Sequence, residues 1–286
     1  MPKSGMLPQD IGLWDNPIDE TGFHRKGNEM TQQQWIDRLR KARETGQPAD
    51  SLESTFGPLT IEEAYAVQEM LIAERLTAGE RIIGWKVGAT SQAVMEQLNI
   101  HEPVYGCMTS SSVHRAKNPV IGSAFCRVAV EGEIAFVMGD SLSGPGVTPS
   151  DVLSATSGIM GAVELVDCRI KGWKATIAEI VADNALHAGL ILGPTRVPVA
   201  ELDLQKERVT LQKNGNVLAE AYGYEALGDP LNVVTWLVNK LAIFDHHLRE
   251  GDLILTGSLT KYFFVSAGDA VDVSFSNLGR IQFSVA

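Results

Sequence analysis

Two short apolar segments of this 286-residue chain carry glutamate near their centres. The first, residues 126–138, contains Glu131 and Glu133, and the second, residues 159–167, contains Glu164. Both are rich in β-favouring residues and apolar on both alternating faces, which predicts buried strands. A buried carboxylate costs several kcal/mol unless a positive group compensates it. The fold must therefore bring a positive charge to these strands.

Glu131 and Glu133 are expected to point to the same side of their strand, about 6.5–7 Å apart along the backbone. Two carboxylates that face one dry space favour a hard divalent cation such as Mg²⁺, Mn²⁺ or Ca²⁺. A solvated strand face is the ordinary explanation of a single Glu-x-Glu, but the apolar flanks and the second strand with Glu164 argue against it. The six histidines show no metal-binding spacing.

Composition restricts the classes of partner. A formal net charge of −11 and a pI of about 5.0 argue against nucleic acid. The three cysteines are isolated, which is typical of reduced thiols in a cytoplasmic protein. No secretory leader is evident, and no apolar stretch reaches the length of a membrane span. An apolar content of 44% is enough for a substantial core.

The chain divides into three parts by local pattern. Residues 1–30 are rich in Gly, Pro and charge and are expected to form an irregular arm. Residues 31–99 are expected to be mainly helical, because capping-box patterns at Thr31 and Thr60 precede apolar periodicity. Residues 100–286 show short strands and turns and are expected to form a β-rich catalytic body. The fold class is therefore α+β.

Several local signals fix further elements. Thr90 is expected to cap a short helix to residue 98, and Thr148 and Asp229, each followed by proline, are expected to open two more. Asn214-Gly215 suits a type I′ turn between two strands. A strand is also expected over residues 82–87, and three strands close the chain, over residues 252–256, 270–275 and 280–285.

A series of motifs runs in a fixed order through residues 55–286. They are Gly84-Trp-Lys-Val-Gly-Ala-Thr90, Glu131-x-Glu133, Val163-Glu164-Leu-Val-Asp167-x-Arg169, Ala182-Asp-Asn184, Gly228-x-Pro230-Leu-Asn232, Leu255-Thr-Gly-Ser258-Leu-Thr260, Gly268-Asp269 and Leu278-Gly279. The series resembles the hydratase/decarboxylase branch of the fumarylacetoacetate hydrolase superfamily, which includes 2-hydroxypentadienoate hydratase and 4-oxalocrotonate decarboxylase. The resemblance implies a mixed β-roll or sandwich body with a helical N-terminal part.

The resemblance also implies the chemistry and its residues. The activity expected is that of a metal-dependent lyase acting on small 2-oxo acids and their dienols in the catabolism of aromatic compounds. Glu131, Glu133 and Glu164 would be the ligands of Mg²⁺ or Mn²⁺, and Lys86 would be the catalytic lysine. A lysine in that place pairs with the substrate carboxylate or moves a proton.

Other polar residues are candidates for supporting roles. Asp167 and Arg169 alternate along one strand face, and we expect an ion pair that positions Glu164 or a plain structural salt bridge. The substrate-binding candidates, each of which also has a capping or turn explanation, are Lys174, Asp183, Asn184, Ser258 and Thr260.

Three functions stay open. The first is a hydratase that adds water to a 2-hydroxy-2,4-dienoate, giving a 4-hydroxy-2-oxo acid. The second is a decarboxylase of a 4-oxalocrotonate-type diacid, which Val104 favours because hydratases of the branch often carry an acidic residue there. The third is a non-catalytic partner subunit, suggested by departures from the pattern at Leu186, Asp229 and residues 261–264. A homo-oligomer is expected, and a complex with a pathway enzyme is a further alternative.

Overall fold

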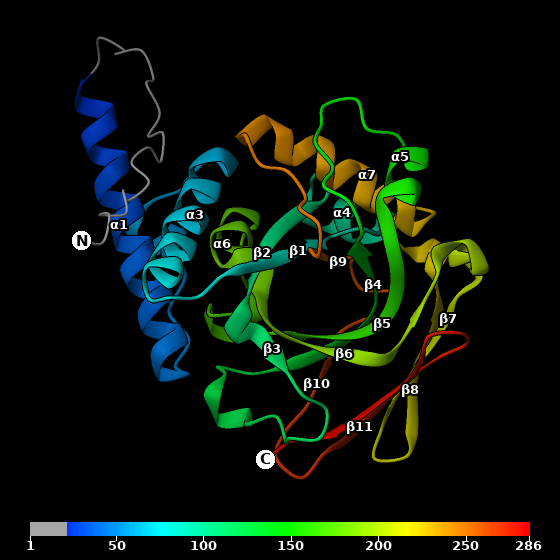
Figure 1. Cartoon of the computed structure of the whole chain (residues 1–286). Coiled ribbons are helices and arrows are strands. Elements are labelled where there is room, and N and C mark those ends of the chain that lie inside the picture. Colours follow the sequence, from blue (N-terminus) through cyan, green and yellow to red (C-terminus); the bar gives the residue numbers. More distant parts are fainter. Residues whose placement is uncertain (1–21) are drawn as a thin grey trace, which may run out of the picture.

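The computed structural model describes residues 22–286, with side chains from residue 29 onward. Its centre is a strongly curled eight-stranded sheet. Figure 1 shows α1, α3 and α6 on one side of this sheet and β7, β8 and β11 on the opposite side. This arrangement confirms the α+β class with a helical N-terminal part. Among the described residues, no helix combines the length and the apolar character needed to cross a membrane.

The α-helices are short except at the N-terminal side. Their bounds are Gly22–Thr45 for α1, Leu52–Phe56 for α2, Ile61–Thr77 for α3, Gln92–Leu98 for α4, Pro149–Ala155 for α5, Ile177–Ala182 for α6 and Pro230–Leu241 for α7. Thr60, Thr148 and Asp229 cap α3, α5 and α7 as predicted, because each side chain accepts a hydrogen bond from a backbone amide of the first turn.

Two helix starts differ from the prediction. The helix expected from Thr31 begins at Gly22, so residues 22–30 are helical rather than irregular. No proline interrupts residues 22–45, and therefore the capping-box pattern at Thr31 lies inside a continuous helix. Residues 1–21 of the expected arm lie outside the described residues. For α4 the cap is Ser91 and not Thr90, because Ser91 accepts the hydrogen bond from Val94 N.

The large sheet has the strand order β2-β1-β9-β4-β5-β6-β3, with β10 paired to β4. It is mixed, because β1 pairs with β9 and β3 with β6 in parallel, whereas β4 is antiparallel to β5, β9 and β10. The strand bounds are Ile82–Gly88 for β1, Val104–Thr109 for β2, Val113–His114 for β3, Ala129–Met138 for β4, Thr156–Val166 for β5, His187–Val197 for β6, Leu253–Leu255 for β9 and Phe263–Phe264 for β10.

A four-stranded antiparallel sheet packs against the outer face of the large one. Its order is β12-β11-β7-β8, with bounds Arg208–Lys213 for β7, Asn216–Tyr222 for β8, Ala270–Phe275 for β11 and Gly279–Ser284 for β12. The β7–β8 turn has positive φ at both Asn214 and Gly215, as the type I′ prediction requires. Close packing is visible at Gly161, where a Cβ atom would lie 2.6 Å from the Phe275 ring.

The inner face of the large sheet encloses the candidate site. It is partly filled by a small apolar cluster that we call the floor, made of Met108, Ala135, Ala162, Leu190 and Leu255, all fully buried. Alternation along β4 places Glu133 and Glu131 next to Ala135 on the same face. The strand β1, expected within the helical part, pairs with β2 and β9 and thus contributes Lys86 to this face.

Candidate active site

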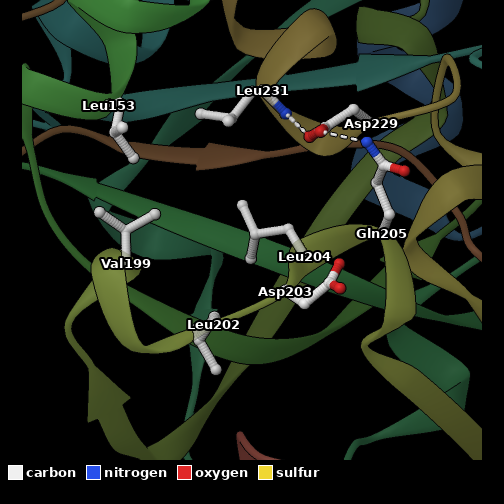
Figure 2. Close-up of a pocket in the computed structure, with 8 residues that line it drawn as sticks. All are labelled: Leu153, Val199, Leu202, Asp203, Leu204, Gln205, Asp229 and Leu231. Atoms are coloured by element: carbon white, nitrogen blue, oxygen red, sulfur yellow. Dashed lines mark hydrogen bonds between the residues drawn. The ribbon is translucent and has the colours of Figure 1, made fainter.

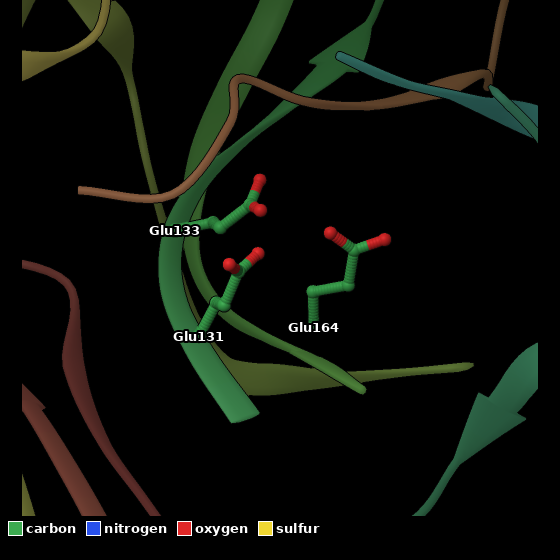
Figure 3. A group of neighbouring side chains, drawn as sticks. All are labelled: Glu131, Glu133 and Glu164. Carbon is green, nitrogen blue, oxygen red and sulfur yellow. The ribbon is translucent and has the colours of Figure 1, made fainter. Parts of the chain in front are cut away.

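Glu131, Glu133 and Glu164 converge on one space at the inner face of the sheet. Glu131 of β4 lies directly opposite Glu164 of β5 in the antiparallel register, and Glu133 follows Glu131 by two residues. One carboxylate oxygen from each residue lies within 4.8 Å of those of the other two. Glu133 and Glu164 are fully buried and Glu131 is half-buried. Figure 3 shows the three carboxyl groups turned toward one another.

The three carboxyl groups differ in their proton affinity. Burial raises the pKa of Glu131 to about 8, and the charge of Glu164 adds to this effect. Burial, together with Glu164 and Glu131, raises the pKa of Glu133 well above its ordinary value. Burial alone would raise the pKa of Glu164 too. Lys86 and His187 outweigh burial and hold the pKa of Glu164 below its ordinary value. The cluster therefore concentrates negative charge on Glu164.

Lys86 provides the nearest positive charge. Its Nζ lies 3.2 Å from Glu164 Oε2 and donates a hydrogen bond of 2.9 Å to the carbonyl oxygen of Ala185. Burial lowers the pKa of Lys86, but Glu164, Glu133 and Glu131 outweigh burial and raise it. One ammonium group cannot balance the three carboxyl groups once all of them are ionised.

The donor set fits a hard divalent cation. Glu133 Oε1 is buried and has no hydrogen-bond partner among the described residues, whereas Glu164 Oε2 faces Lys86 Nζ at 3.2 Å. Buried polar atoms are rarely left unpaired, so Glu133 Oε1 needs a positive partner. Three carboxylates supply the oxygen ligands that Mg²⁺, Mn²⁺ and Ca²⁺ prefer. The sequence-based proposal of a metal site at these residues is thus consistent with their geometry.

Two groups that the sequence did not reveal hold the glutamates. The backbone N–H of Gly257, which follows β9, donates a hydrogen bond of 2.9 Å to Glu133 Oε2. His187 lies with Nδ1 2.7 Å from Glu164 Oε1 and is only 1% exposed. When Glu164 is ionised it can only accept, so Nδ1 is then the donor. Nε2 has no hydrogen-bond partner among the described residues. His187 opens the apolar run of β6, but only strand pairing brings it to Glu164.

A left-handed turn after α6 places the Ala185 carbonyl over Lys86. The 3₁₀ segment η4 (Asn184–Leu186) has positive φ at all three residues. Asn184 fixes it to β2 through two hydrogen bonds of 2.8 Å with the backbone of Cys107. The backbone of η4 approaches Gly106 so closely that a Cβ there would overlap the Asn184 carbonyl. Asn184, predicted to bind substrate, therefore has a structural contact set of its own.

Asp167, Arg169 and Asp183 form a buried network beside the site. Arg169 Nη1 lies 3.2 Å from Asp183 Oδ1, and Arg169 Nε lies 3.7 Å from Asp167 Oδ2. Arg169 also donates to the His187 carbonyl at 3.3 Å. No ion pair or hydrogen bond joins Asp167 or Arg169 to Glu164 in the described part of the chain. The hydrogen bonds of Arg169 to the His187 carbonyl link this network to the residue whose ring contacts Glu164.

The remaining candidates lie toward the surface or bond to the backbone. Ser258 Oγ donates to the Thr260 carbonyl, and Thr260 Oγ1 accepts from Gly132 N at 3.4 Å. Lys174 is exposed and ends the 3₁₀ segment η3 (Lys171–Trp173). Their roles in substrate binding stay predictions.

A cavity of about 300 Å³ lies elsewhere, and none of the site residues lines it. Figure 2 shows its lining, which is Leu153, Val199, Leu202, Asp203, Leu204, Gln205, Asp229 and Leu231. Its two aspartates already have partners, since Asp229 caps α7 and Asp203 pairs with Lys206 at 2.6 Å. Because its other side chains are mostly apolar, this cavity lacks the chemistry of the carboxylate cluster.

Comparison with known proteins identifies the family. Residues 83–286, well over half of the chain, match the model described as fumarylacetoacetate (FAA) hydrolase C-terminal. The chain belongs to the fumarylacetoacetate hydrolase family. The matched segment begins in β1 and includes Lys86 and all three glutamates. This confirms the family resemblance found in the sequence.

Relatives within the fumarylacetoacetate hydrolase family align over most of the chain. A 2-hydroxyhexa-2,4-dienoate hydratase of Comamonas testosteroni is 35% identical over 263 residues, covering 89% of this chain and all of that protein. A 2-hydroxypent-2,4-dienoate hydratase of Pseudomonas putida is 38% identical over 228 residues, covering 79% of this chain and 99% of that protein. A solved structure of 4-oxalocrotonate decarboxylase from Pseudomonas putida G7, complexed with magnesium and adipate, has a TM-score of 0.87 and 28% identity, covering 94% of this chain and 100% of that one.

Proposed function

We propose that this protein is a divalent-metal-dependent hydratase that converts a 2-hydroxy-2,4-dienoate into a 4-hydroxy-2-oxo acid in the catabolism of aromatic compounds. The observation that carries the proposal is the match to two hydratases over 100% and 99% of their own lengths. The convergence of Glu131, Glu133 and Glu164 beside Lys86 supports it, because this donor set suits a metal-assisted lyase.

The site residues have two expected roles, which are to bind the metal and to pair with the anionic substrate. Glu131, Glu133 and Glu164 would hold Mg²⁺ or Mn²⁺, and magnesium is the ion named with the decarboxylase structure. A cation held there supplies Lewis-acid polarisation of the 2-oxo group. Lys86 Nζ, at 3.2 Å from Glu164, supplies a second positive charge that pairs with the anionic 2-oxo acid head. The fully buried floor gives the site an apolar border, since Ala162, Leu190 and Leu255 are paired with Glu133, Glu164 and Lys86.

The reaction conserves all atoms of the dienol and adds those of water. Protonation at C5, matched by loss of the 2-hydroxyl proton, gives a 2-oxo-3-enoate. Water then adds across the C3–C4 double bond, with hydroxyl on C4 and hydrogen on C3. Negative charge develops on the C2 oxygen in both steps, which is the place where the positive charge of Lys86 is useful.

A second candidate is the decarboxylase activity, and one local feature favours it. Val104 pairs with Gly88 at the end of β1, and a Cβ at Gly88 would lie 3.4 Å from Lys86 Nζ and 3.6 Å from Val104 Cγ2. The apolar Val104 side chain and the Lys86 ammonium thus both lie next to Gly88, and Val104 stands where hydratases of this branch often carry an acid. The structural similarity to 4-oxalocrotonate decarboxylase agrees with this alternative.

One assay separates the candidates. The protein with Mg²⁺ is incubated with 2-hydroxypenta-2,4-dienoate and, separately, with 4-oxalocrotonate. We expect 4-hydroxy-2-oxopentanoate from the first substrate, and no product with Glu133→Gln. Release of CO₂ from the second substrate without hydration of the first would replace the hydratase proposal by the decarboxylase. Absence of both products, with no metal binding, would support a non-catalytic partner subunit.

Assembly and location are further parts of the proposal. We infer a homo-oligomer, in line with the exposed apolar side chains of Ile121, Val217 and Ile243, and sedimentation as a monomer at micromolar concentration would contradict it. A complex with a pathway enzyme is a further proposal, which the same exposed apolar side chains support.

We infer a reducing compartment such as the cytoplasm, because the three cysteines are free. The division of the chain at residue 99 stays a proposal. Strand β1, on the N-terminal side of that division, pairs with β2 and β9 of the body.

A further inference from the structure

Three aromatic rings meet beside β4 and have no part in the chemistry described above. The ring centroids of Trp173 and Tyr262 are 4.8 Å apart, those of Trp173 and Phe264 are 4.9 Å apart, and those of Tyr262 and Phe264 are 5.5 Å apart. The guanidinium of Arg127 lies over the Phe264 ring, 3.6 Å from its centroid. We call Trp173, Tyr262 and Phe264 the aromatic wall.

Strand register places the aromatic wall on the same face as the carboxylates. Phe264 of β10 is paired with Ala129 of β4, and paired residues in a sheet project to the same side. Ala129 precedes Glu131 by two residues, so both project to the inner face, about 7 Å apart along the strand. Tyr262 precedes Phe264 by two residues and contacts its ring. In this antiparallel pair, the chain from Phe264 back to Tyr262 runs in the direction in which β4 runs from Ala129 to Glu131.

The inner face is ordered along β4. The aromatic wall borders Ala129 at one end, Glu131 and Glu133 follow, and Ala135 of the floor lies beyond them. Exposure follows the same order, since the floor residues, Glu133 and Glu164 are buried, Glu131 is half-buried and Tyr262 is 46% exposed. A ligand whose head reaches the carboxylates thus extends its tail toward the aromatic wall.

We propose that the aromatic wall binds the distal end of the substrate, and that the substrates are dienols with an alkyl or aryl group beyond the 2-oxo acid head. This inference rests on the proposed function, since the head must bind at the carboxylates. Contact with an aromatic ring contributes most binding free energy when it buries apolar surface of the ligand. The competing occupant is an anionic tail on Arg127. That guanidinium is exposed and already stacked on Phe264, and exposed ion pairs contribute little.

The test measures binding of saturated 2-oxo acids, which keep the head and cannot be hydrated. Dissociation constants are determined by calorimetry, in the presence of Mg²⁺, for pyruvate, 2-oxooctanoate, 4-phenyl-2-oxobutanoate and 2-oxoadipate. We expect the alkyl and phenyl compounds to bind about tenfold more tightly than pyruvate. We expect 2-oxoadipate to bind no more tightly than pyruvate.

Matched variants assign the gain to the wall. The readout is the ratio of the pyruvate dissociation constant to that of 4-phenyl-2-oxobutanoate. Tyr262→Ala is expected to lower this ratio about fivefold, whereas Tyr262→Phe retains the ring and the ratio. Tyr222→Ala is the control, because Tyr222 is 39% exposed and stacks on Tyr224 at 5.5 Å on β8, in the other sheet.

The failures of the two proposals are distinguishable. If pyruvate binds and the tails add no affinity, the wall has no role in recognition and the proposed function stands. The inference is also overturned if 2-oxoadipate binds most tightly and Arg127→Met removes that preference. If none of the four compounds binds in a metal-dependent way, the 2-oxo acid site itself is wrong and both proposals fall.

Discussion

At the scale of single residues, the site depends on how Glu164 is held. Lys86 lies 3.2 Å from one of its oxygens and His187 lies 2.7 Å from the other. These contacts fix the direction of the carboxylate before any cation binds. Residues that orient a metal ligand in this way commonly change metal affinity when they are replaced.

The His187–Glu164 contact gives a prediction about metal affinity. His187→Leu removes the donor, and we expect the Mn²⁺ dissociation constant measured by calorimetry to rise about tenfold or more. His187→Asn keeps an N–H donor at a similar distance from the backbone and is expected to recover part of the loss. Equal affinities in the wild type and the leucine variant would show that His187 only fills space.

At the scale of elements, parallel pairing of β1 and β9 requires glycine at one position. Gly84 has a φ of 144°, and a Cβ there would overlap the backbone of Leu253. The same pairing sets Lys86 opposite Leu255 and so fixes the position of Lys86 along the inner face of the sheet. A backbone requirement in one strand pair thereby controls the position of a functional side chain.

Gly84→Ala is therefore expected to be severe, with a loss of about 4 kcal/mol or more in the free energy of unfolding. Gly251→Ala is the matched control, because Gly251 also has a positive φ of 86° but has open space where a Cβ would lie. The control isolates backbone strain, for which about 1–2 kcal/mol is expected. Urea unfolding measures both, and similar losses would argue against close contact of β1 with β9.

Glu179 joins two helices of the N-terminal side. It is fully buried, and its Oε1 accepts hydrogen bonds from Ser51 Oγ, Leu52 N and Glu53 N at the start of α2. Oε2 accepts one from Thr176 N at the start of α6. The carboxylate thus serves two helix starts at once, where negative charge is favourable.

Glu179→Ala leaves these buried donors without an acceptor, and we expect a loss of about 3 kcal/mol in the free energy of unfolding. Glu179→Gln keeps one acceptor oxygen and is expected to lose less. Denaturant unfolding at neutral pH measures both variants. A loss in the alanine variant no greater than that of an exposed substitution such as Glu44→Ala would refute the role of Glu179 as a bridge.

At the scale of the whole molecule, the large sheet gathers the site from distant parts of the sequence. Lys86 comes from β1, the glutamates from β4 and β5, His187 from β6 and the Gly257 amide from the segment after β9. Pairing of adjacent strands therefore brings charged residues that are far apart in the chain close enough to interact. Binding of a cation at the centre is expected to stabilise the whole sheet.

Metal removal tests that coupling. At a free Mg²⁺ or Mn²⁺ concentration a hundred times Kd, binding stabilises the fold by about 2.7 kcal/mol, which corresponds to a rise of about 5 °C in Tm. A chelator is expected to reverse the rise. Glu133→Gln is expected to abolish it while leaving the metal-free protein at least as stable as the wild type, because one source of carboxylate repulsion is gone. An unchanged wild-type Tm would contradict the metal site.

Features that depend on near neighbours in the chain could be predicted from the sequence. The caps at Thr60, Thr148 and Asp229, the Asn214-Gly215 turn and the shared face of Glu131 and Glu133 follow from hydrogen bonds and alternation within a few residues. The predicted start of α1 at Thr31 was wrong, because a capping pattern can also lie inside a helix that no proline interrupts.

Contacts across strands, in contrast, became known only from the tertiary structure. Glu131 lies opposite Glu164, His187 reaches Glu164 and the Gly257 amide reaches Glu133, because the strands pair in one particular order and register. That register is set by packing over the whole sheet, including the close approach at Gly84, and no local pattern encodes it. Local interactions thus determined which face of a strand each side chain occupies, and long-range packing determined which residues on other strands it contacts.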